Sequence, residues 1–440
     1  MRGVRIFRRL GIHLLAFNST LRHGRAEPVV ITGIGMLASV GQDRESVWRA
    51  VRQGRSGVRP LLGLPGIPEG LLLGAPADVG PGLPRGSRVI AMCRQAAGEA
   101  IRDAEIDFRQ LDRDRFGCAI GAHIGDTRFI EGRCGYDIES AAHDVPWWQQ
   151  WLPNTACSTI AGELGLYGPR ICHSTACASG LIEILSAARA IQDHQCDIAL
   201  AGSGEAFHPL FAAGFHRMRV LAYDDEPQKA CRPFDANRKG FVMGEGAGMF
   251  VIERLGHAQA RGATIYAELA GGAMAAEAHH VTGLDTDGEA LAYVIRRAMD
   301  KAGVGRREID YINAHGTGTR QNDLTEVHGI RRALGPGAEQ TCVSATKSML
   351  GHLVNASGSV ELAITTLALR DGFAPPTLNL TDQDPDCDLD CLPLIGRTRP
   401  LETALKLSVA FGGHLVAITL RRWKDTQSST AVQPSRGAAA

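Results

Sequence analysis

The sequence lacks the features that would place it in several large classes of protein. Its 440 residues contain no apolar run of the roughly 20 residues that a membrane span needs. Lys and Arg number 47 in total, and so do Asp and Glu, so no excess charge of one sign points to nucleic acid or to a membrane surface. We therefore expect a globular protein that binds neither.

Cysteine pairs at regular spacing are absent as well. The eleven cysteines are scattered, and their odd number argues against a disulfide framework, which favours a reducing, cytoplasmic setting. Cys387 and Cys391 resemble half of a metal site, but they have no second Cys or His pair at zinc spacing. We predict two loop cysteines there and no metal site in the chain.

The two ends of the chain differ in composition from the rest. Residues 1–27 are rich in arginine and poor in acidic residues, which is typical of an organelle presequence. We prefer the alternative of a translation start assigned too far upstream, or of a surface extension, because the folded pattern begins at Pro28. Residues 424–440 are rich in Ser, Thr, Gly and Ala and are predicted to be disordered.

The segment between these ends is long enough for two domains or for one large duplicated fold. Short apolar strands alternate in it with helices, which indicates α/β layers built on largely parallel sheets. We expect strands at 28–35, 117–121, 197–202, 248–253, 264–270, 310–315, 341–344 and 416–420, and helices at 88–106, 180–191, 288–302 and 355–369. Each half, 28–263 and 264–423, places a reactive type of residue just beyond a strand. This weak symmetry hints at a duplicated fold with a site between its halves.

Cys177 lies between an apolar strand end and a helix, in the segment ICHSTACASGLIEILSAARA at 171–190. Free amides and the positive end of the helix dipole stabilise an anion at a helix N-terminus. We therefore expect a lowered pKa for the Cys177 thiol and a reactive thiolate. The alternative is a small buried cysteine without chemistry, and the segment alone does not decide between the two.

The second half carries two histidines in unusual settings. His315 ends a predicted strand in front of a loop rich in Gly and Thr, and His352 follows Lys347 by five residues, just before a helix. Each alone could be a structural histidine. Together with Cys177 they form a set in which a thiolate takes an acyl group and two imidazoles polarise a carbonyl and stabilise an enolate. This set suits carbon–carbon bond formation better than hydrolysis.

A charged stretch rich in glycine, RPFDANRKGFVMGEGAG, occupies residues 232–248. It is too irregular for a helix or a strand, and we expect it to cradle a ligand or to pack tightly against a site. No Gly-Lys-Ser/Thr follows it, so we reject nucleotide binding there.

Five motifs resemble, in order, those of the β-ketoacyl-ACP synthases, most closely the type II elongating enzymes. They are STACASG at Cys177, PFDANRKGFVMGEGAG, NAHGTGT at His315, TKSMLGHLVNASG at His352 and AFGGH near the C-terminus, within about Pro28 to Arg422. The resemblance implies the thiolase-type fold, in which two similar halves stack in five layers as α-β-α-β-α. It also implies acyl carrier protein (ACP) as a partner and a homodimer, with a heterodimer with a related subunit as the alternative.

The resemblance implies a role for each matching residue. Cys177 receives the acyl chain, and His315 and His352 bind the malonyl thioester and support decarboxylation. Lys347 organises the electrostatics of the site, paired with the buried Glu361, because an unpaired buried charge is strongly destabilising. The remaining roles are the amides of Cys177 and Phe411 as oxyanion hole, Phe215 and Phe411 as acyl gate, and Thr317 and Thr319 as contacts of the pantetheine arm. No cofactor is implied, because the substrates are carried on the phosphopantetheine arm of ACP.

The chain departs from the family pattern around Phe411. His414 and Leu415 stand where many relatives have Thr-Asn, and Val409 and Ala410 stand where they have Phe-Gly, which predicts a stiffer loop. Other departures are Glu277, His279 and the aromatic residues Trp147, Trp148 and Trp151. These changes favour a specialised or secondary-metabolite synthase over ordinary fatty-acid elongation.

The leading hypothesis is a 3-oxoacyl-ACP synthase that condenses an acyl group with malonyl-ACP in fatty acid or polyketide-type biosynthesis. The alternative is a non-condensing partner subunit that sets chain length, although such relatives lose the nucleophilic cysteine. An acyltransferase or a decarboxylase on the same fold also stays open, whereas a thiolase would need a second cysteine near AFGGHL. Arg217 and Arg219 are candidates for docking the acidic carrier protein, or else a solvated pair.

Overall fold

The computed structural model describes residues 27–62, 72–79, 88–122 and 152–424. The predictions made for residues 1–26 and 425–440, and for Trp147, Trp148 and Trp151, lie outside these ranges. Within the ranges, no helix combines the length and the apolar character needed to cross a membrane.

A mixed sheet of ten strands forms the centre of the described chain. Its hydrogen-bonded order is β11-β10-β14-β15-β9-β1-β8-β6-β4-β5. The strands are β1 (Val29–Ala38), β4 (Phe116–Gly121), β5 (Arg170–Ile171), β6 (Ile198–Glu205), β8 (Gly246–Arg254), β9 (Ala267–Ala276), β10 (Tyr311–Asn313), β11 (Cys342–Ser344), β14 (Thr403–Ala410) and β15 (His414–Arg422). Smaller sheets are formed by β2 (Arg59–Pro60), β3 (Leu73–Ala75) and β7 (Met243–Gly244), and by β12 (Phe373–Ala374) and β13 (Arg397–Thr398).

The large sheet is a duplicated arrangement of two five-stranded halves. In the first half, β4 runs parallel to β5 and β6, and β8 runs antiparallel to β6 and β1. In the second half, β10 runs parallel to β11 and β14, and β15 runs antiparallel to β14 and β9. The halves meet where β1 pairs with β9, at Val30 with Glu268 and Ile31 with Ala267. The predicted duplication is confirmed.

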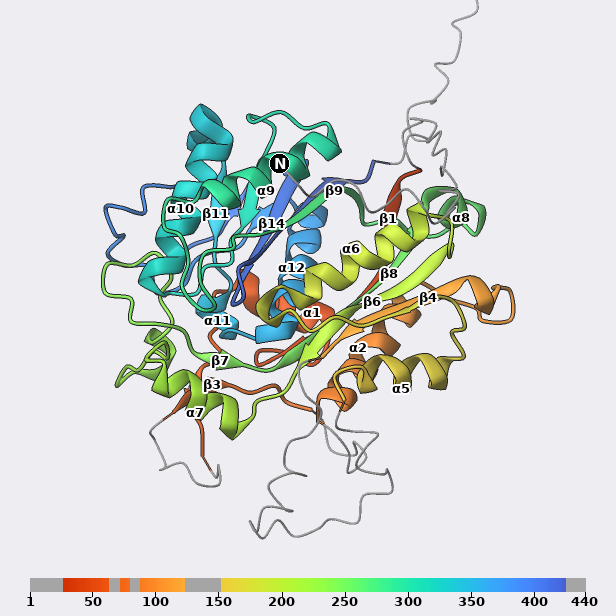
Figure 1. Cartoon of the computed structure of the whole chain (residues 1–440), viewed down its shortest axis with the longest axis horizontal. Coiled ribbons are helices and arrows are strands. Elements are labelled where there is room, and N and C mark those ends of the chain that lie inside the picture. The colour runs from red at the N-terminus through yellow and green to blue at the C-terminus, as the bar shows by residue number, and fades with distance from the viewer. Residues whose placement is uncertain (1–26, 63–71, 80–87, 123–151, 425–440) are drawn as a thin grey trace, which may run out of the picture.

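Helices complete five layers, as Figure 1 shows. α2 and α5 cover the outer face of the first half, and α9 and α10 lie on the outer side of the second half. α6 and α12 lie between the halves, and residues Ser357 to Leu369 of α12 are all buried. The helices are α1 (Arg44–Arg52), α2 (Arg88–Asp103), α5 (Thr155–Leu164), α6 (Ser179–Gln192), α7 (Pro209–Arg217), α8 (Leu255–Ala260), α9 (Glu289–Ala302), α10 (Arg320–Leu334), α11 (Lys347–Leu350) and α12 (Ser357–Asp371).

The prediction of largely parallel sheets is wrong. Five of the nine pairings in the large sheet are antiparallel. One of them joins β14 to β15 through the short turn at 411–413, and so short a connection permits only an antiparallel pair. No strand was predicted at β14, because Lys406 and Ser408 interrupt its apolar pattern.

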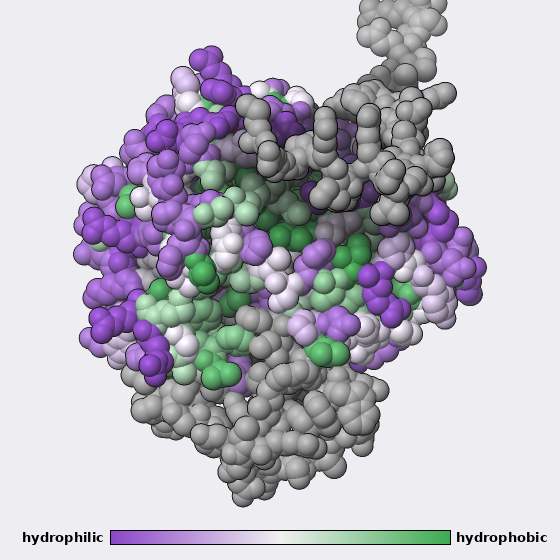
Figure 2. All heavy atoms as spheres, in the orientation of Figure 1, coloured by the Kyte–Doolittle hydropathy of each residue, from purple (hydrophilic) through white to green (hydrophobic). Residues whose placement is uncertain are grey.

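The face shown in Figure 2 is divided between polar and apolar surface. Hydrophilic side chains gather over α9 and α10, whereas hydrophobic ones are concentrated towards the centre of the face and over α7. Leu210 and Met218, at the two ends of α7, expose 63% and 41% of their surface. The site described below lies where α6 and α12 begin.

Candidate active site

Cys177 occupies the strand-turn-helix junction that the sequence predicted. β5 leads through a loop into a short 3₁₀ turn, Ala176–Ala178, and α6 begins at Ser179. Ala176 adopts a left-handed φ of 48°, which turns the chain sharply before the cysteine. Ser179 Oγ accepts the N–H of Thr175 (2.9 Å) and lies 2.5 Å from Oδ1 of Asn355, so both halves of the fold hold this turn.

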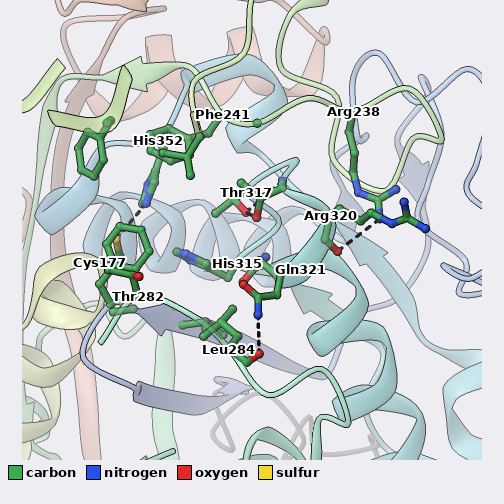
Figure 3. Close-up of a pocket in the computed structure, with 18 of the residues that line it drawn as sticks. Cys177, Arg238, Phe241, Thr282, Leu284, His315, Thr317, Arg320, Gln321 and His352 are labelled. Carbon is green, nitrogen blue, oxygen red and sulfur yellow. Dashed lines mark hydrogen bonds between the residues drawn. The ribbon is translucent and has the colours of Figure 1, made fainter. Parts of the chain in front are cut away.

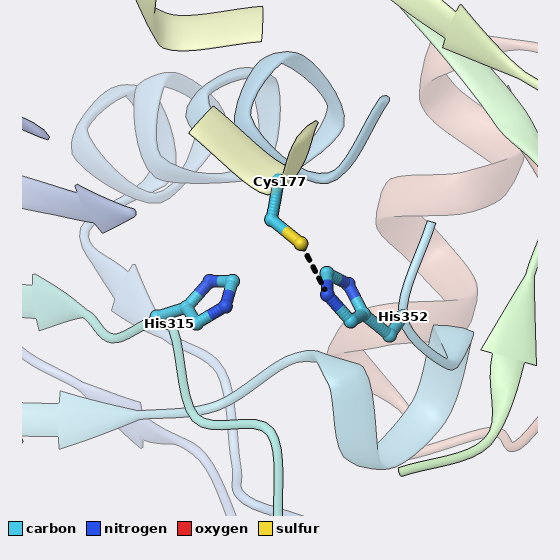
Figure 4. Close-up of side chains that lie close together, drawn as sticks. All are labelled: Cys177, His315 and His352. Atoms are coloured by element: carbon cyan, nitrogen blue, oxygen red, sulfur yellow. Dashed lines mark hydrogen bonds between the residues drawn. The ribbon is translucent and has the colours of Figure 1, made fainter. Parts of the chain in front are cut away.

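His352 contacts the thiol directly. Its Nε2 lies 3.0 Å from Sγ of Cys177, and its Nδ1 lies 2.8 Å from Oγ of Ser357 in the first turn of α12. Figure 4 shows Cys177 pointing between His352 and His315. When Nδ1 carries the proton and donates it to Ser357, the Nε2 lone pair faces the S–H group. His352 is therefore placed to accept the thiol proton.

His315 stands on the other side of the thiol, with its ring centroid 5.2 Å from that of His352 and the planes at 84°. Lys347 Nζ lies 3.3 Å from His315 Nδ1 and 2.6 Å from the carbonyl oxygen of His315. Because an ammonium only donates, Nδ1 accepts and the ring proton sits on Nε2. His315 thus presents an N–H donor to the cavity.

Buried charged side chains contact His315 on the side away from the cavity. Lys347 also donates to Glu361, at 2.7 and 3.0 Å to its two carboxylate oxygens, and both side chains are buried. Glu326, on α10, accepts the backbone N–H groups of His315 and Gly316 at 2.5 Å each. The structure thus brings the predicted Lys347 and Glu361 together and adds Glu326, which the motifs did not single out.

The expected lowering of the Cys177 pKa is wrong. The side chain is only 6% exposed, and burial raises the pKa of the thiol to about 12, although the charge of Lys347 opposes this. Burial and the charge of Lys347 also lower the pKa of His315 and His352 well below the usual range of histidine. The resting site therefore contains a neutral thiol beside two neutral imidazoles, and thiolate formation requires a base at the moment of reaction.

A cavity of about 360 Å³ opens onto these three side chains (Figure 3). Thr317 and Thr319 line it, with their hydroxyl oxygens 2.8 Å apart. Asn322 lines it too, and its Oδ1 is buried without a hydrogen-bond partner in the described chain. The cavity is therefore lined by both polar and apolar side chains, as suits a long arm with amide groups.

Aromatic rings form a continuous row along the cavity. The ring centroids of Phe411 and Phe215 are 6.3 Å apart, those of Phe215 and Phe241 are 5.3 Å apart, and those of Phe241 and His352 are 5.0 Å apart. The row connects both predicted gate residues, Phe411 and Phe215, to His352 through ring contacts. Phe241 was missed, although it belongs to the glycine-rich stretch that was expected near a site.

The stretch at 232–248 packs against the site, as predicted. The N–H of His352 donates to Val242 O (2.6 Å), and Gly244 N–H donates to His352 O (2.9 Å). Gly240 has a φ of +132°, and a Cβ there would lie 2.2 Å from Val220 O, so glycine is required for this close approach. The stretch positions His352.

The two predicted docking arginines, Arg217 and Arg219, lie near each other, but only Arg219 lines the cavity. Both are exposed, and Arg219 lines the mouth of the cavity together with the exposed Lys239 and Arg320. Arg217 does not line it, but lies beside Arg219 in a neighbouring surface pocket. The mouth of the cavity is thus positively charged.

The departures from the family pattern that fall within the described ranges lie around one turn. Gly412 N–H donates to Val281 O (2.8 Å), and Glu277 N–H donates to Gly413 O (2.8 Å), so the turn that follows Phe411 is tied to the segment carrying Glu277. Val409 and Ala410 line the cavity just before this turn, and His414 begins β15 just after it. A stiffer gate at Ala410 stays a prediction.

Cys177, His315 and His352 also have donor atoms within 4.8 Å of one another, close enough for a metal ion, and no other such group occurs in the described ranges. The Lys347 ammonium keeps the proton of His315 on Nε2, the atom that a metal would need. The donor set therefore suits hydrogen bonding to a carbonyl oxygen better than metal binding.

Comparison with known proteins gives a consistent result over most of the chain. Residues 26–68 and 84–258 match the family model described as "Beta-ketoacyl synthase, N-terminal domain", and residues 266–381 match "Beta-ketoacyl synthase, C-terminal domain". The sequence is 40% identical over 410 residues to 3-oxoacyl-[acyl-carrier-protein] synthase 2 of Vibrio cholerae, covering 90% of this chain and 99% of that protein. It is 38% identical over 417 residues to the actinorhodin polyketide putative beta-ketoacyl synthase 1 of Streptomyces coelicolor, covering 90% and 89%.

Solved structures resemble this one as well. One is a type II polyketide synthase acyl-carrier protein in complex with its ketosynthase bound to the hexaketide, with a TM-score of 0.84 and 32% identity over 91% of this chain and 100% of that chain. Another is a β-ketoacyl synthase from Burkholderia phymatum, with a TM-score of 0.83 and 30% identity over 90% and 100%.

Proposed function

This chain belongs to the β-ketoacyl synthase family and is a condensing enzyme of the acyltransferase type, and we propose that Cys177 carries the acyl group that it extends. The proposed reaction joins this acyl group to malonyl-ACP and yields 3-oxoacyl-ACP, carbon dioxide and free ACP. The observation that carries the assignment is the convergence of Cys177, His315 and His352 on one cavity, with Sγ 3.0 Å from His352 Nε2. No observation favours the non-condensing subunit over this reaction.

In the first half-reaction, Cys177 takes the acyl group from its carrier. His352 Nε2 accepts the thiol proton as Sγ attacks the thioester carbonyl, which compensates for the raised pKa of the buried thiol. Among the described residues, the N–H groups of Cys177 and Phe411 donate to no other residue, so both are available to the developing oxyanion. The carrier thiolate leaves and takes the proton back from His352.

In the second half-reaction, malonyl-ACP occupies the cavity. The Nε2–H of His315 donates to the thioester carbonyl and stabilises the enolate that forms as the carboxylate departs as carbon dioxide. The enolate carbon attacks the acyl carbon, the C–S bond to Cys177 breaks, and the thiolate takes up a proton. Lys347 acts from behind by keeping the His315 proton on Nε2.

We further propose that an acyl carrier protein delivers both substrates. Support comes from the exposed Arg219, Lys239 and Arg320 at the mouth of the cavity and from the hydroxyls of Thr317 and Thr319 within it. A positive rim suits an acidic carrier, and the hydroxyls suit the amides of a pantetheine arm. No cofactor beyond this arm is needed in the proposed scheme.

We propose a dimer and a specialised acyl substrate as well. β5 is the last strand of the sheet in the described ranges, and Leu152 and Tyr167 near it expose 50% and 69% of their surface, which supports pairing with a second copy or a related subunit. The departures at Val409 and Ala410, which line the cavity, support a polyketide-type or otherwise specialised chain.

The test is intact-protein mass spectrometry with a panel of acyl-ACPs, followed by malonyl-ACP. We expect a mass gain that Cys177→Ala abolishes and that disappears, with 3-oxoacyl-ACP formed, when malonyl-ACP is added. The acyl-ACP that gives the fastest gain identifies the preferred chain. Acylation that malonyl-ACP does not discharge would refute condensation, and no acylation by any donor would favour the partner subunit.

A further inference from the structure

A second buried ammonium lies behind His315, and none of the motifs includes it. Lys406 projects from β14 and is fully buried, as is Glu361 apart from 1% of its surface. Its Nζ lies 2.7 Å from Oε2 of Glu361, whose Oε1 is paired with Lys347 at 2.7 Å. One carboxylate on α12 therefore binds two ammonium groups, one from each side.

Lys406 also binds the backbone that leads to His315. β10 and β14 are parallel with Asn313 opposite Lys406, and Lys406 Nζ lies 3.4 Å from Asn313 O and 3.0 Å from Ala314 O. The next carbonyl, that of His315, accepts from Lys347 at 2.6 Å. Three successive carbonyl oxygens thus accept from two lysines, at the point where β10 ends and the chain turns to present the imidazole.

Two lysines and two acidic residues lie buried behind His315. Lys347 and Lys406 both pair with Glu361, and Glu326 also favours the charged form of Lys406. Burial lowers the pKa of the Lys406 ammonium to about 8, and Glu361 opposes the decrease, so the group carries its charge at pH 7. Burial raises the pKa of Glu326 to about 7, so at pH 7 Glu326 is only partly ionised and Glu361 is the carboxylate that the two ammoniums share.

We propose that Lys406 is a positioning residue for His315, which it acts on by clamping the carbonyls of Asn313 and Ala314 and by sharing Glu361 with Lys347. This inference rests on the proposed function, because His315 matters there for the malonyl step. Acylation of Cys177 depends on His352, which Ser357 and the stretch at 232–248 hold in place without Lys406. The charge of Lys406 also lowers the pKa of His352, but less than burial and Lys347 do. Loss of Lys406 should therefore slow the malonyl step far more than it changes acylation.

The experiment measures the two half-reactions separately in the full-length chain, by rapid quench and intact mass, for the wild type and Lys406→Met. We expect acylation of Cys177 to stay within about threefold of the wild type. Discharge of the acyl-enzyme by malonyl-ACP should slow about 10- to 100-fold, since a displacement of a catalytic group by a fraction of an ångström has effects of this order. The matched control is Lys301→Met, which removes an exposed ammonium from a backbone carbonyl, Gly272 O at 3.0 Å, and should change neither step.

A second variant, Lys406→Ala, leaves a space next to three oxygen acceptors, those of Asn313, Ala314 and Glu361. Methylammonium fits such a space and donates as lysine does, so it should restore the discharge step, whereas tetramethylammonium, which has no N–H, should not. Equal slowing of both half-reactions, an unchanged discharge step, or failure of both variants to fold would each overturn the positioning role. A wild-type chain that is acylated but never discharged would instead refute the proposed function, and this role with it.

Discussion

Ser357→Ala is the variant that tests most directly how the neutral thiol is activated. Ser357 Oγ lies 2.8 Å from Nδ1 of His352, and the opposite ring atom, Nε2, lies 3.0 Å from Cys177 Sγ. The Ser357 hydroxyl can accept a hydrogen bond from Nδ1–H, and in that arrangement the Nε2 lone pair faces the S–H group. Removing the hydroxyl removes the acceptor for Nδ1–H, so it should disfavour this reactive tautomer and leave the ring in place.

The size of the effect follows from one buried hydrogen bond. Such a bond contributes about 1 kcal/mol net, and a buried donor left without a partner costs about 1–3 kcal/mol. A bias weaker by about 1.4 kcal/mol corresponds to a tenfold slower reaction. We therefore expect acylation of Cys177, and its alkylation by iodoacetamide at pH 7, to slow about tenfold.

Peptide mapping after timed exposure to iodoacetamide measures the reaction at Cys177 itself. The matched control is Ser359→Ala, because Ser359 lies two residues further along α12, is equally buried and bonds to Ser203 instead of to a histidine. A slowing of less than twofold in Ser357→Ala would refute the reasoning. So would an equal slowing in both variants, since the effect would then come from the packing of α12.

Three further predictions concern charge. Glu361→Gln removes the carboxylate that two buried ammoniums share, at a cost of about 4 kcal/mol. With an unfolding entropy of about 0.9 kcal/mol/K for 440 residues, the apparent Tm should fall by about 4 °C. A fall of less than about 1 °C would contradict the pairing. Reversing Arg217 and Arg219 to Glu should raise the apparent KM for acyl-ACP about tenfold and spare a small thioester mimic, whereas equal losses on both would exclude docking there. Burial raises the pKa of Glu253, but Arg261, His257 and Thr32 outweigh burial and lower this pKa to about 2. The Glu253 carboxylate therefore adds about 3 kcal/mol to the free energy of unfolding above about pH 4.5, and this contribution is lost as the pH falls towards 2. Urea titrations of Glu253→Gln should accordingly differ most from the wild type at neutral pH, and a difference independent of pH would refute this.

Local sequence was sufficient for the junction at Cys177. An apolar strand end, small residues and a helical pattern follow one another within about twenty positions of the sequence, so neighbouring residues were enough to predict the turn, although Asn355 of the second half also holds it. His315 and His352 were found in the same way, each by its place at the end of an element and in a motif. The pairing of Lys347 with Glu361 was implied by the family resemblance, and the distance of 2.7 Å agrees with it.

Properties that depend on distant contacts were predicted wrongly or missed. The predicted strand directions were wrong because the length of the connection, such as the turn at 411–413, determines whether two strands run parallel or antiparallel. The strand β14 was missed because Lys406 and Ser408 interrupt its apolar pattern. The pKa of Cys177 was wrong because helix polarity can be read from sequence, whereas the degree of burial cannot.

The sequence by itself therefore determined the family, the duplicated fold and the three side chains that the structure brings together at the cavity. Only the tertiary structure decided which groups hold them. Glu326 binds the backbone of His315 from 11 positions away in the sequence, and Lys406 binds Ala314 from 92 positions away. Ser357 matters because it contacts His352, whose ring contacts a thiol 175 positions away. Burial and distance set the charge states of the site, and both arise only when the two halves of the chain pack against each other.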